Sequence, residues 1–160
     1  MTDPIRPTDD EARALARGLI ADATYGAIGV LDPESGTPMV SRIAVVPGPD
    51  GLPLALVSDL SHHTRALKAN PACSMLVGEP GAKGDPLTWP RLTLLGTARF
   101  TRHGDATHRD LADHFVAKQP KAKLYIGFGD FALLQLTLTG AHLNGGFGKA
   151  FVLTPEDLQA

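Results

Sequence analysis

The residues best suited to chemistry lie between positions 54 and 71, where the pattern predicts a strand, a turn and a short helix. Ser61 is of the type preferred at a helix N-cap, where its hydroxyl can accept a hydrogen bond from a backbone N–H group. Pro71 predicts that the helix ends at Asn70, because the residue before a proline is driven out of the helical conformation.

The start of this predicted helix has the character of an anion site. Its first backbone N–H groups carry the positive end of the helix dipole, and His62, His63, Arg65 and Lys68 surround them with further donors. Such an end suits a phosphate, so we interpret the segment as the docking point of a phosphate-bearing cofactor. The alternative is an ordinary surface helix with solvated cations.

Composition limits the class of protein. A chain of 160 residues with 17 Gly and 13 Pro predicts one globular domain, residues 1–160, with many turns and strands. A net charge of −2 supplies no overall field for nucleic acid or an anionic membrane. Cys73 is the only cysteine, which excludes an internal disulfide and a cysteine-based zinc site. Without a signal-peptide pattern or a run of about 18 apolar residues, we expect a cytoplasmic protein.

The remaining chain predicts a mainly β protein. Thr8 and Glu11 form a capping-box pattern for a helix over about 8–23, and Asp105 is placed to cap a second helix ending near Lys118. Strands are predicted at 27–31, 39–46, 54–58, 73–77, 90–100 and 131–138, with a strand or pair of strands over 141–153 and a helical turn at 154–157. Gly96 predicts a bulge. This order favours an antiparallel β-barrel with peripheral helices.

Five segments occur in an order that resembles a known family: residues 37–42, 57–67, 70–76, 91–96 and 145–150. Together they resemble the FMN-binding split-barrel family related to pyridoxamine 5'-phosphate oxidase, and within it the haem-utilisation (HugZ-like) branch. The resemblance covers roughly residues 10–153. It implies a six-stranded antiparallel split barrel that works as a homodimer, with two flavin sites at the dimer interface.

The resemblance also implies which residues hold FMN. Arg42 matches the basic residue of the second strand that binds the phosphate, and the turn after the third strand supplies Ser58, Ser61, His63 and Thr64. An arginine offers two charge-assisted donors to a phosphate at once, which agrees with this assignment. Without the resemblance, Arg42 would be interpreted as a solvated charge at a strand edge.

Two further residues are implied at the flavin. Arg91 matches a polar residue that the partner subunit offers to the flavin ring, and Lys149 falls near the C-terminal segment that closes the site. Glycines at 145, 146 and 148 would let the backbone approach a flat ring, although Gly145–Gly146 alone would indicate only a bulge.

The sequence departs from the family in ways that bear on activity. Residues 154–160 do not match the basic tail of the oxidases, so we do not expect vitamin B6 oxidation. Haem-degrading members use a histidine in a C-terminal extension, and only ten residues follow Ala150, so we do not transfer that role to His142. Ala66 stands where the family usually has Asn. We identify no catalytic residue and expect no metal site.

Three hypotheses follow. The first is an FMN-binding flavoprotein that acts as an oxidoreductase on a small molecule. The second is a haem-binding or haem-utilisation protein on the same scaffold. The third is a dimeric binding module without catalysis. None of the residues identifies the substrate or the electron donor.

Overall fold

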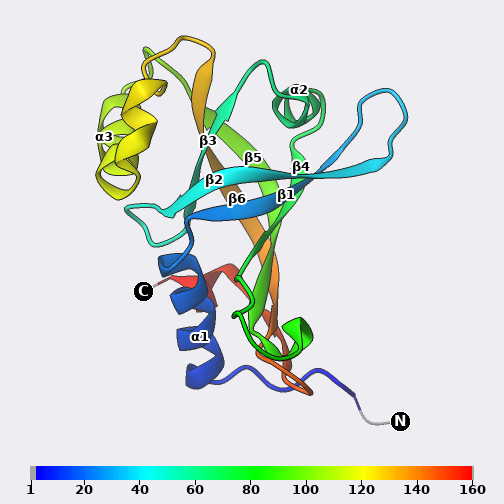
Figure 1. Ribbon diagram of the computed structural model, residues 1–160. Helices are drawn as coiled ribbons and strands as arrows, with labels where there is room; N and C mark the ends of the chain where they lie inside the picture. Colours follow the sequence, from blue (N-terminus) through cyan, green and yellow to red (C-terminus); the bar gives the residue numbers. More distant parts are fainter. Residues whose placement is uncertain (1–2, 160) are drawn as a thin grey trace.

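Seven strands form one antiparallel sheet in the computed structural model, which describes residues 3–159 (Figure 1). The strands are β1 (Tyr25–Leu31), β2 (Pro38–Pro47), β3 (Pro53–Ser58), β4 (Ala72–Val77), β5 (Arg91–Thr101), β6 (Phe131–Asn144) and β7 (Ala150–Leu153). Their order is β3-β2-β1-β4-β5-β6-β7, and a further pairing of β3 with β6 closes six strands into a barrel. The predicted fold class, a six-stranded antiparallel split barrel, is therefore confirmed.

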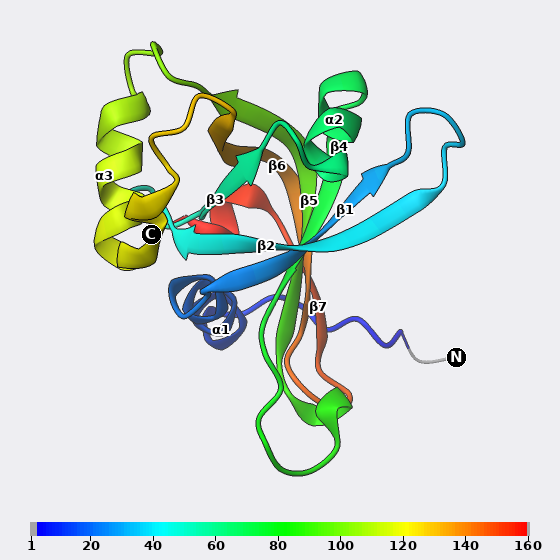
Figure 2. The ribbon, with the colours of Figure 1, turned by 45° about the horizontal axis from the view of Figure 1, so that its top comes forward.

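Helices lie outside or at the ends of this barrel, as predicted. They are α1 (Asp10–Ala21), α2 (His62–Ala69) and α3 (His108–Lys118), with short 3₁₀ turns η1 (Pro86–Thr88), η2 (Pro120–Leu124) and η3 (Pro155–Leu158). The β4–β5 connection, which contains η1, extends from the barrel on the side away from α2 (Figure 2). None of the helices among residues 3–159 is long and apolar enough to cross a membrane.

Two apolar clusters hold these elements in place. The larger one fills the barrel and includes Ile28, Met75 and Leu94, all fully buried. The smaller one lies outside β3, where Leu54 and Phe115 pack between the sheet and α3. Strand β3 is therefore apolar on both faces, because one face contacts the barrel interior and the other contacts α3 and η2.

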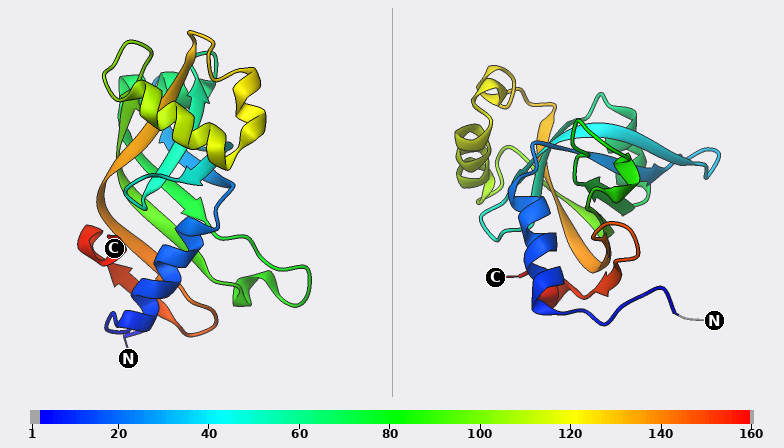
Figure 3. Two further views of the ribbon diagram at one scale, coloured as in Figure 1. Left: turned by 90° about the vertical axis from the view of Figure 1, so that its left-hand side faces the viewer. Right: turned by 60° about the horizontal axis from the view of Figure 1, so that its bottom comes forward.

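The first helix begins differently from the prediction. Thr8 is not its N-cap, because Asp9 takes that position and its Oδ1 accepts from the backbone N–H of Ala12 at 2.8 Å. The Thr8 hydroxyl instead donates to the carbonyl oxygen of Val152 in β7, at 2.9 Å. Both residue types cap helices well, so the contact with β7 decides between them. Figure 3 shows α1 beside η3, and an Arg13 Nε to Asp157 Oδ1 contact of 2.6 Å joins the two.

The other predicted features of the helices, strands and turns are partly confirmed. The prediction that Asp105 caps a helix is wrong: α3 begins at His108, and Asp105 accepts from the backbone N–H of Arg102 at 2.7 Å to close the preceding turn. Strand β6 continues to residue 144, past the predicted end at 138. The bulge at Gly96 is confirmed by a register shift between Leu95 and Gly96 in the β5–β6 pairing. The turn at 154–157 is confirmed as η3.

Candidate functional site

One cavity collects several of the predicted site residues. It has a volume of about 330 Å³ and lies on the outer side of β2 and β3, beside the start of α2. Its polar lining comes from Arg42, Ser58, Ser61 and His63, and its remaining walls are apolar or aromatic, including Tyr125 and Phe131. Mostly apolar walls with a few convergent polar groups are typical of small-molecule sites, which usually exceed about 300 Å³.

Strand alternation places Arg42 at this cavity. On β2 the side chains of Ile43 and Val45 enter the barrel, so Arg42 and Ala44 face outward. The Arg42 guanidinium carbon lies 5.1 Å from the centre of the Tyr25 ring. Within residues 3–159 no carboxylate forms an ion pair with Arg42, so its positive charge is not neutralised by the chain itself.

The start of α2 presents backbone donors without acceptors. Ser61 is the N-cap residue as predicted, but its hydroxyl accepts no hydrogen bond from a backbone N–H group of the helix, so that part of the prediction is wrong. The first N–H group of this turn with a backbone acceptor is that of Arg65, which donates to the carbonyl oxygen of Ser61 at 3.3 Å. In the described part of the chain, the N–H groups of residues 62–64 therefore remain open to an anion.

Two buried polar atoms in the first turn of α2 also lack partners. Thr64 is fully buried, and its Oγ1 makes no hydrogen bond. His63 has Nδ1 at 3.1 Å from the Ser41 hydroxyl oxygen, whereas its buried Nε2 has no partner. Burial, and then the neighbouring His62, lowers the pKa of His63, so its imidazole is neutral at physiological pH. Buried polar groups usually have a partner, and no residue of the described part of the chain supplies one to these two atoms.

Other predicted donors are occupied. The Ser58 hydroxyl donates to Asp130 Oδ2 at 2.7 Å and accepts from the backbone N–H of Leu60 at 3.1 Å. Lys68 is paired, because its ammonium lies 2.8 Å from an oxygen of Asp59 in the turn before α2.

The other neighbouring charges also have partners. Asp59 has a second contact with Arg102 at 3.0 Å, and the two cations lower the pKa of this carboxyl. His62 contacts Asp32 at 2.9 Å. Among the described residues, Arg42 and the start of α2 therefore keep donors at the cavity that no carboxylate occupies.

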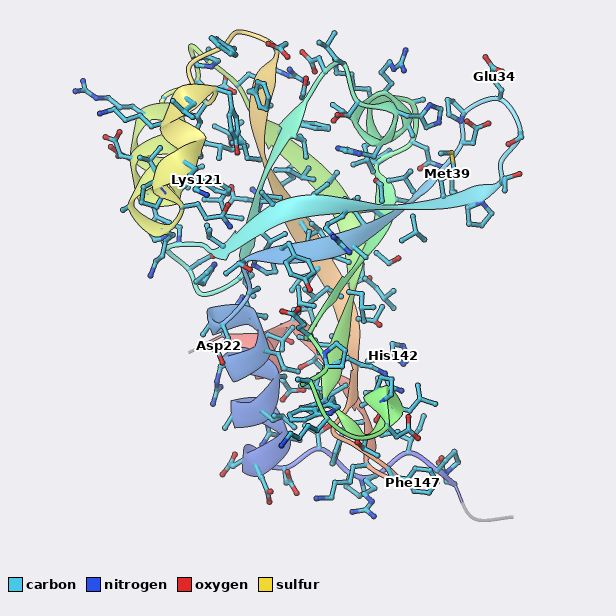
Figure 4. All side chains as sticks on the ribbon, in the orientation of Figure 1. Asp22, Glu34, Met39, Lys121, His142 and Phe147 are labelled. Atoms are coloured by element: carbon cyan, nitrogen blue, oxygen red, sulfur yellow. The ribbon has the colours of Figure 1, made fainter. Side chains whose placement is uncertain are left out.

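Arg91 and Lys149 lie elsewhere in the chain. Arg91 donates to the carbonyl oxygens of Leu87 and Trp89 at 3.0 and 3.2 Å, and it lines a separate cavity of about 230 Å³ that also contains His142. Lys149 lines a third cavity, of about 210 Å³, near the start of α1. Figure 4 shows His142 and the loop of Phe147 in the half of the molecule away from α2.

The sequence did not single out the aromatic residues at this site. Tyr125 lies in a segment without hydrophobic periodicity, and the alternation that begins at Phe131 predicts only a strand. Their rings are 5.1 Å apart and form one wall of the cavity. The only sequence signal for them is that aromatic residues occur on both sides of the glycine pair Gly127 and Gly129.

Comparison with known proteins identifies the family. A sequence model described as pyridoxamine 5'-phosphate oxidase matches residues 12–144, most of the chain. The chain therefore belongs to the pyridoxamine 5'-phosphate oxidase family, which confirms the resemblance inferred from its motifs.

Relatives with names that refer to haem are among the similar proteins. The chain is 33% identical over 127 residues to the chloroplast non-canonical haem oxygenase HOZ of Arabidopsis thaliana, which covers 76% of this chain. It spans only 36% of that relative. The solved structure of a haem-binding protein from Mycobacterium smegmatis has a TM-score of 0.81 at 29% identity, over 96% of this chain and 61% of that one. A protein of unknown function from Agrobacterium tumefaciens gives a TM-score of 0.81 at 31% identity, over 99% and 66%.

Proposed function

We propose that this protein binds FMN, with the phosphate held at the start of α2. The observation that carries the proposal is that an unneutralised Arg42 lines one cavity with Ser61 and His63 of the α2 start, where the N–H groups of residues 62–64 have no acceptor. A phosphate near charge −2 would supply acceptors for all of these groups, and each bond would be charge-assisted. Ser61 and His63 line the same cavity and would contribute further polar contacts.

Ser58 is not expected to donate a hydrogen bond to the phosphate. Its hydroxyl already donates to Asp130, so we expect Ser58 to stabilise the turn between β3 and α2. Bound FMN would supply two-electron redox chemistry for a small-molecule substrate, while the chain supplies position and electrostatics.

The proposal includes a homodimer. Arg91 and Lys149 line cavities separate from that of Arg42, so within one chain they do not complete the site. A second copy that brings its own Arg91 to the flavin would reunite the residues implied by the family resemblance. Lys149 would then lie near the C-terminal segment that closes over the ligand, as the family resemblance implies.

Haem binding is the second candidate function. It is supported by the relatives at 29% and 33% identity whose names refer to haem. Within this chain, His63 offers a neutral imidazole with an unpaired Nε2, and the neutral form is the one that binds iron.

Titration of the purified protein with FMN and with haemin tests both candidates. We expect FMN fluorescence to be quenched on binding, and Arg42→Ala to weaken binding by about 1.5–3 kcal/mol, or about 10- to 150-fold in Kd. Arg99→Ala, which removes an exposed arginine of β5 outside the cavity, is the matched control and should bind normally.

The same titration contains the outcomes that contradict the proposal. Unchanged FMN affinity in Arg42→Ala would remove the phosphate site from the start of α2. A Soret band with haemin that His63→Ala abolishes, without FMN binding, would select the second candidate. Binding of neither ligand would leave a non-catalytic dimeric module.

A further inference from the structure

Tyr25 lies beside Arg42 on the outer face of the barrel. In the β1–β2 pairing Tyr25 is opposite Ala44 and Arg42 is opposite Ala27, so the two side chains are diagonal neighbours on one face. The guanidinium carbon is 5.1 Å from the ring centre, within the range of a cation–π contact. Arg42 lines the proposed ligand cavity, whereas Tyr25 lines an adjacent cavity of about 400 Å³.

This contact restrains a flexible side chain without using its donors. An exposed arginine loses much conformational freedom when it binds a ligand, and that loss reduces the affinity. A ring that attracts the guanidinium through its aromatic face removes part of this freedom beforehand. The N–H groups lie in the plane of the guanidinium, so they stay available to an anion in the neighbouring cavity.

A carboxylate lies near the Tyr25 hydroxyl. Glu79, at the start of the β4–β5 connection, raises the pKa of Tyr25, and burial of the phenol adds to this effect. The phenol is therefore neutral at physiological pH. Glu79 forms no ion pair with Arg42. The donor groups of Arg42 are therefore not occupied by this carboxylate.

We propose that Tyr25 is a positioning residue of the ligand site: its ring holds the Arg42 guanidinium at the edge of the cavity with the donor groups unpaired. This inference rests on the proposed function, because it requires Arg42 to bind the anionic group of the ligand. Tyr25 itself need not touch the ligand. Its contribution is to the orientation of Arg42 before binding.

Fluorescence quenching of FMN, measured with five proteins, tests the inference: the wild type, Tyr25→Leu, Tyr25→Phe, Arg42→Ala and the double variant Tyr25→Leu/Arg42→Ala. We expect Tyr25→Leu to raise the Kd about two- to fivefold, the effect of an exposed cation–π contact. Tyr25→Phe keeps the ring and should bind like the wild type. In the Arg42→Ala background, Tyr25→Leu should have no further effect.

Results other than these would overturn either the positioning role of Tyr25 alone or the proposed function as well. If Arg42→Ala weakens binding but Tyr25→Leu does not, the positioning role is wrong and the proposed function stands. An equal loss from Tyr25→Leu in both backgrounds, or a Tyr25→Phe variant as weak as Tyr25→Leu, also overturns the positioning role. If Arg42→Ala binds FMN normally, both the proposed function and this inference fail. Thermal unfolding of each variant separates these effects from a loss of folding.

Discussion

His63 illustrates how its surroundings set the charge of a single side chain. One ring nitrogen contacts the Ser41 hydroxyl, the other is buried without a partner, and no carboxylate of the described residues pairs with the ring. Burial therefore opposes protonation, and the neighbouring His62 adds to this effect. The start of α2 therefore carries a neutral, unpaired nitrogen that adds no charge of its own to the site.

The lowered pKa of His63 predicts how stability depends on pH. Below the unfolded value of 6.5 the unfolded state binds more protons than the folded state, so the free energy of unfolding should fall as the pH is lowered. His63→Gln should flatten this fall, measured by urea unfolding between about pH 7 and pH 5. His142→Gln changes an exposed histidine and is the control. An unchanged slope in His63→Gln would contradict the prediction.

For single residues, the sequence predicted contacts between nearby segments better than it predicted contacts between distant segments. Strand alternation and a three-residue turn leave few ways to arrange Arg42, Ser61 and His63, and these residues do line one cavity. The hydrogen bond of Ser58 with Asp130 joins residues 72 positions apart, and no local sequence pattern predicts it. The Tyr25 contact with Arg42 likewise depends on the register of β1 against β2.

The β5–β6 pair shows why one glycine is required within an element. A Cβ at Gly96 would overlap the carbonyl oxygen of Thr137 on β6, which is backbone and cannot turn aside. We expect Gly96→Ala to lower the free energy of unfolding by about 1–3 kcal/mol, measured by urea unfolding, because the two strands must separate locally. Gly18→Ala is the matched control. Open space surrounds Gly18 in α1, and this change should stabilise the helix by about 0.5–1 kcal/mol. Equal stability of Gly96→Ala and the wild type would contradict the close approach.

The positions of the strands were predicted better than the first residues of the helices. Strand positions followed from alternation and turn residues, and β3 was predicted to within one residue. Helix starts were less certain, because several polar residues near each start could act as the cap. Tertiary contacts decide among them: Thr8 contacts β7 and Asp105 closes the turn after β5, so neither caps a helix. Residues 141–144 continue β6 because they pair with both β5 and β7.

The whole molecule leaves one outer sheet face uncovered. Leu76, Thr93, His142 and Val152 follow one another across β4, β5, β6 and β7 in the pairing register. The side chains of Leu76 and Val152 remain 41% and 46% exposed. Arg91 lines the same cavity as these four residues. If the partner's Arg91 reaches the flavin, as the family resemblance implies, this face must lie against the second copy.

Light scattering after size-exclusion chromatography tests that arrangement. We expect the wild type to have twice the 16.9 kDa mass of the chain, and Leu76→Asp to shift it toward the monomer, because a buried charge in an apolar contact is unfavourable. Leu124→Asp is the control, since Leu124 is 79% exposed on η2, away from this face. A wild-type monomer, or a Leu76→Asp variant that remains dimeric, would contradict the placement of the interface.

The complete topology was accessible from the sequence mainly through the family resemblance. Composition and turns predicted an antiparallel barrel, but they did not predict that β1 pairs with β4 or that β3 pairs with β6. Such pairings join strands that are distant in sequence. Their stability comes from packing between segments, which the sequence of a single segment does not predict. Local patterns likewise do not determine the oligomeric state.

The closure of the barrel by β6 has a consequence for biosynthesis. Residues 131–134 of β6 pair with β3, and the strand also pairs along its length with β5. While the nascent chain is still on the ribosome, both partner strands therefore expose unsatisfied backbone groups. At about 5–20 residues per second, translation of the segment between β3 and β6 takes seconds, so the barrel is complete only after residue 144 has been made. A chaperone that shields strand edges would act in this interval.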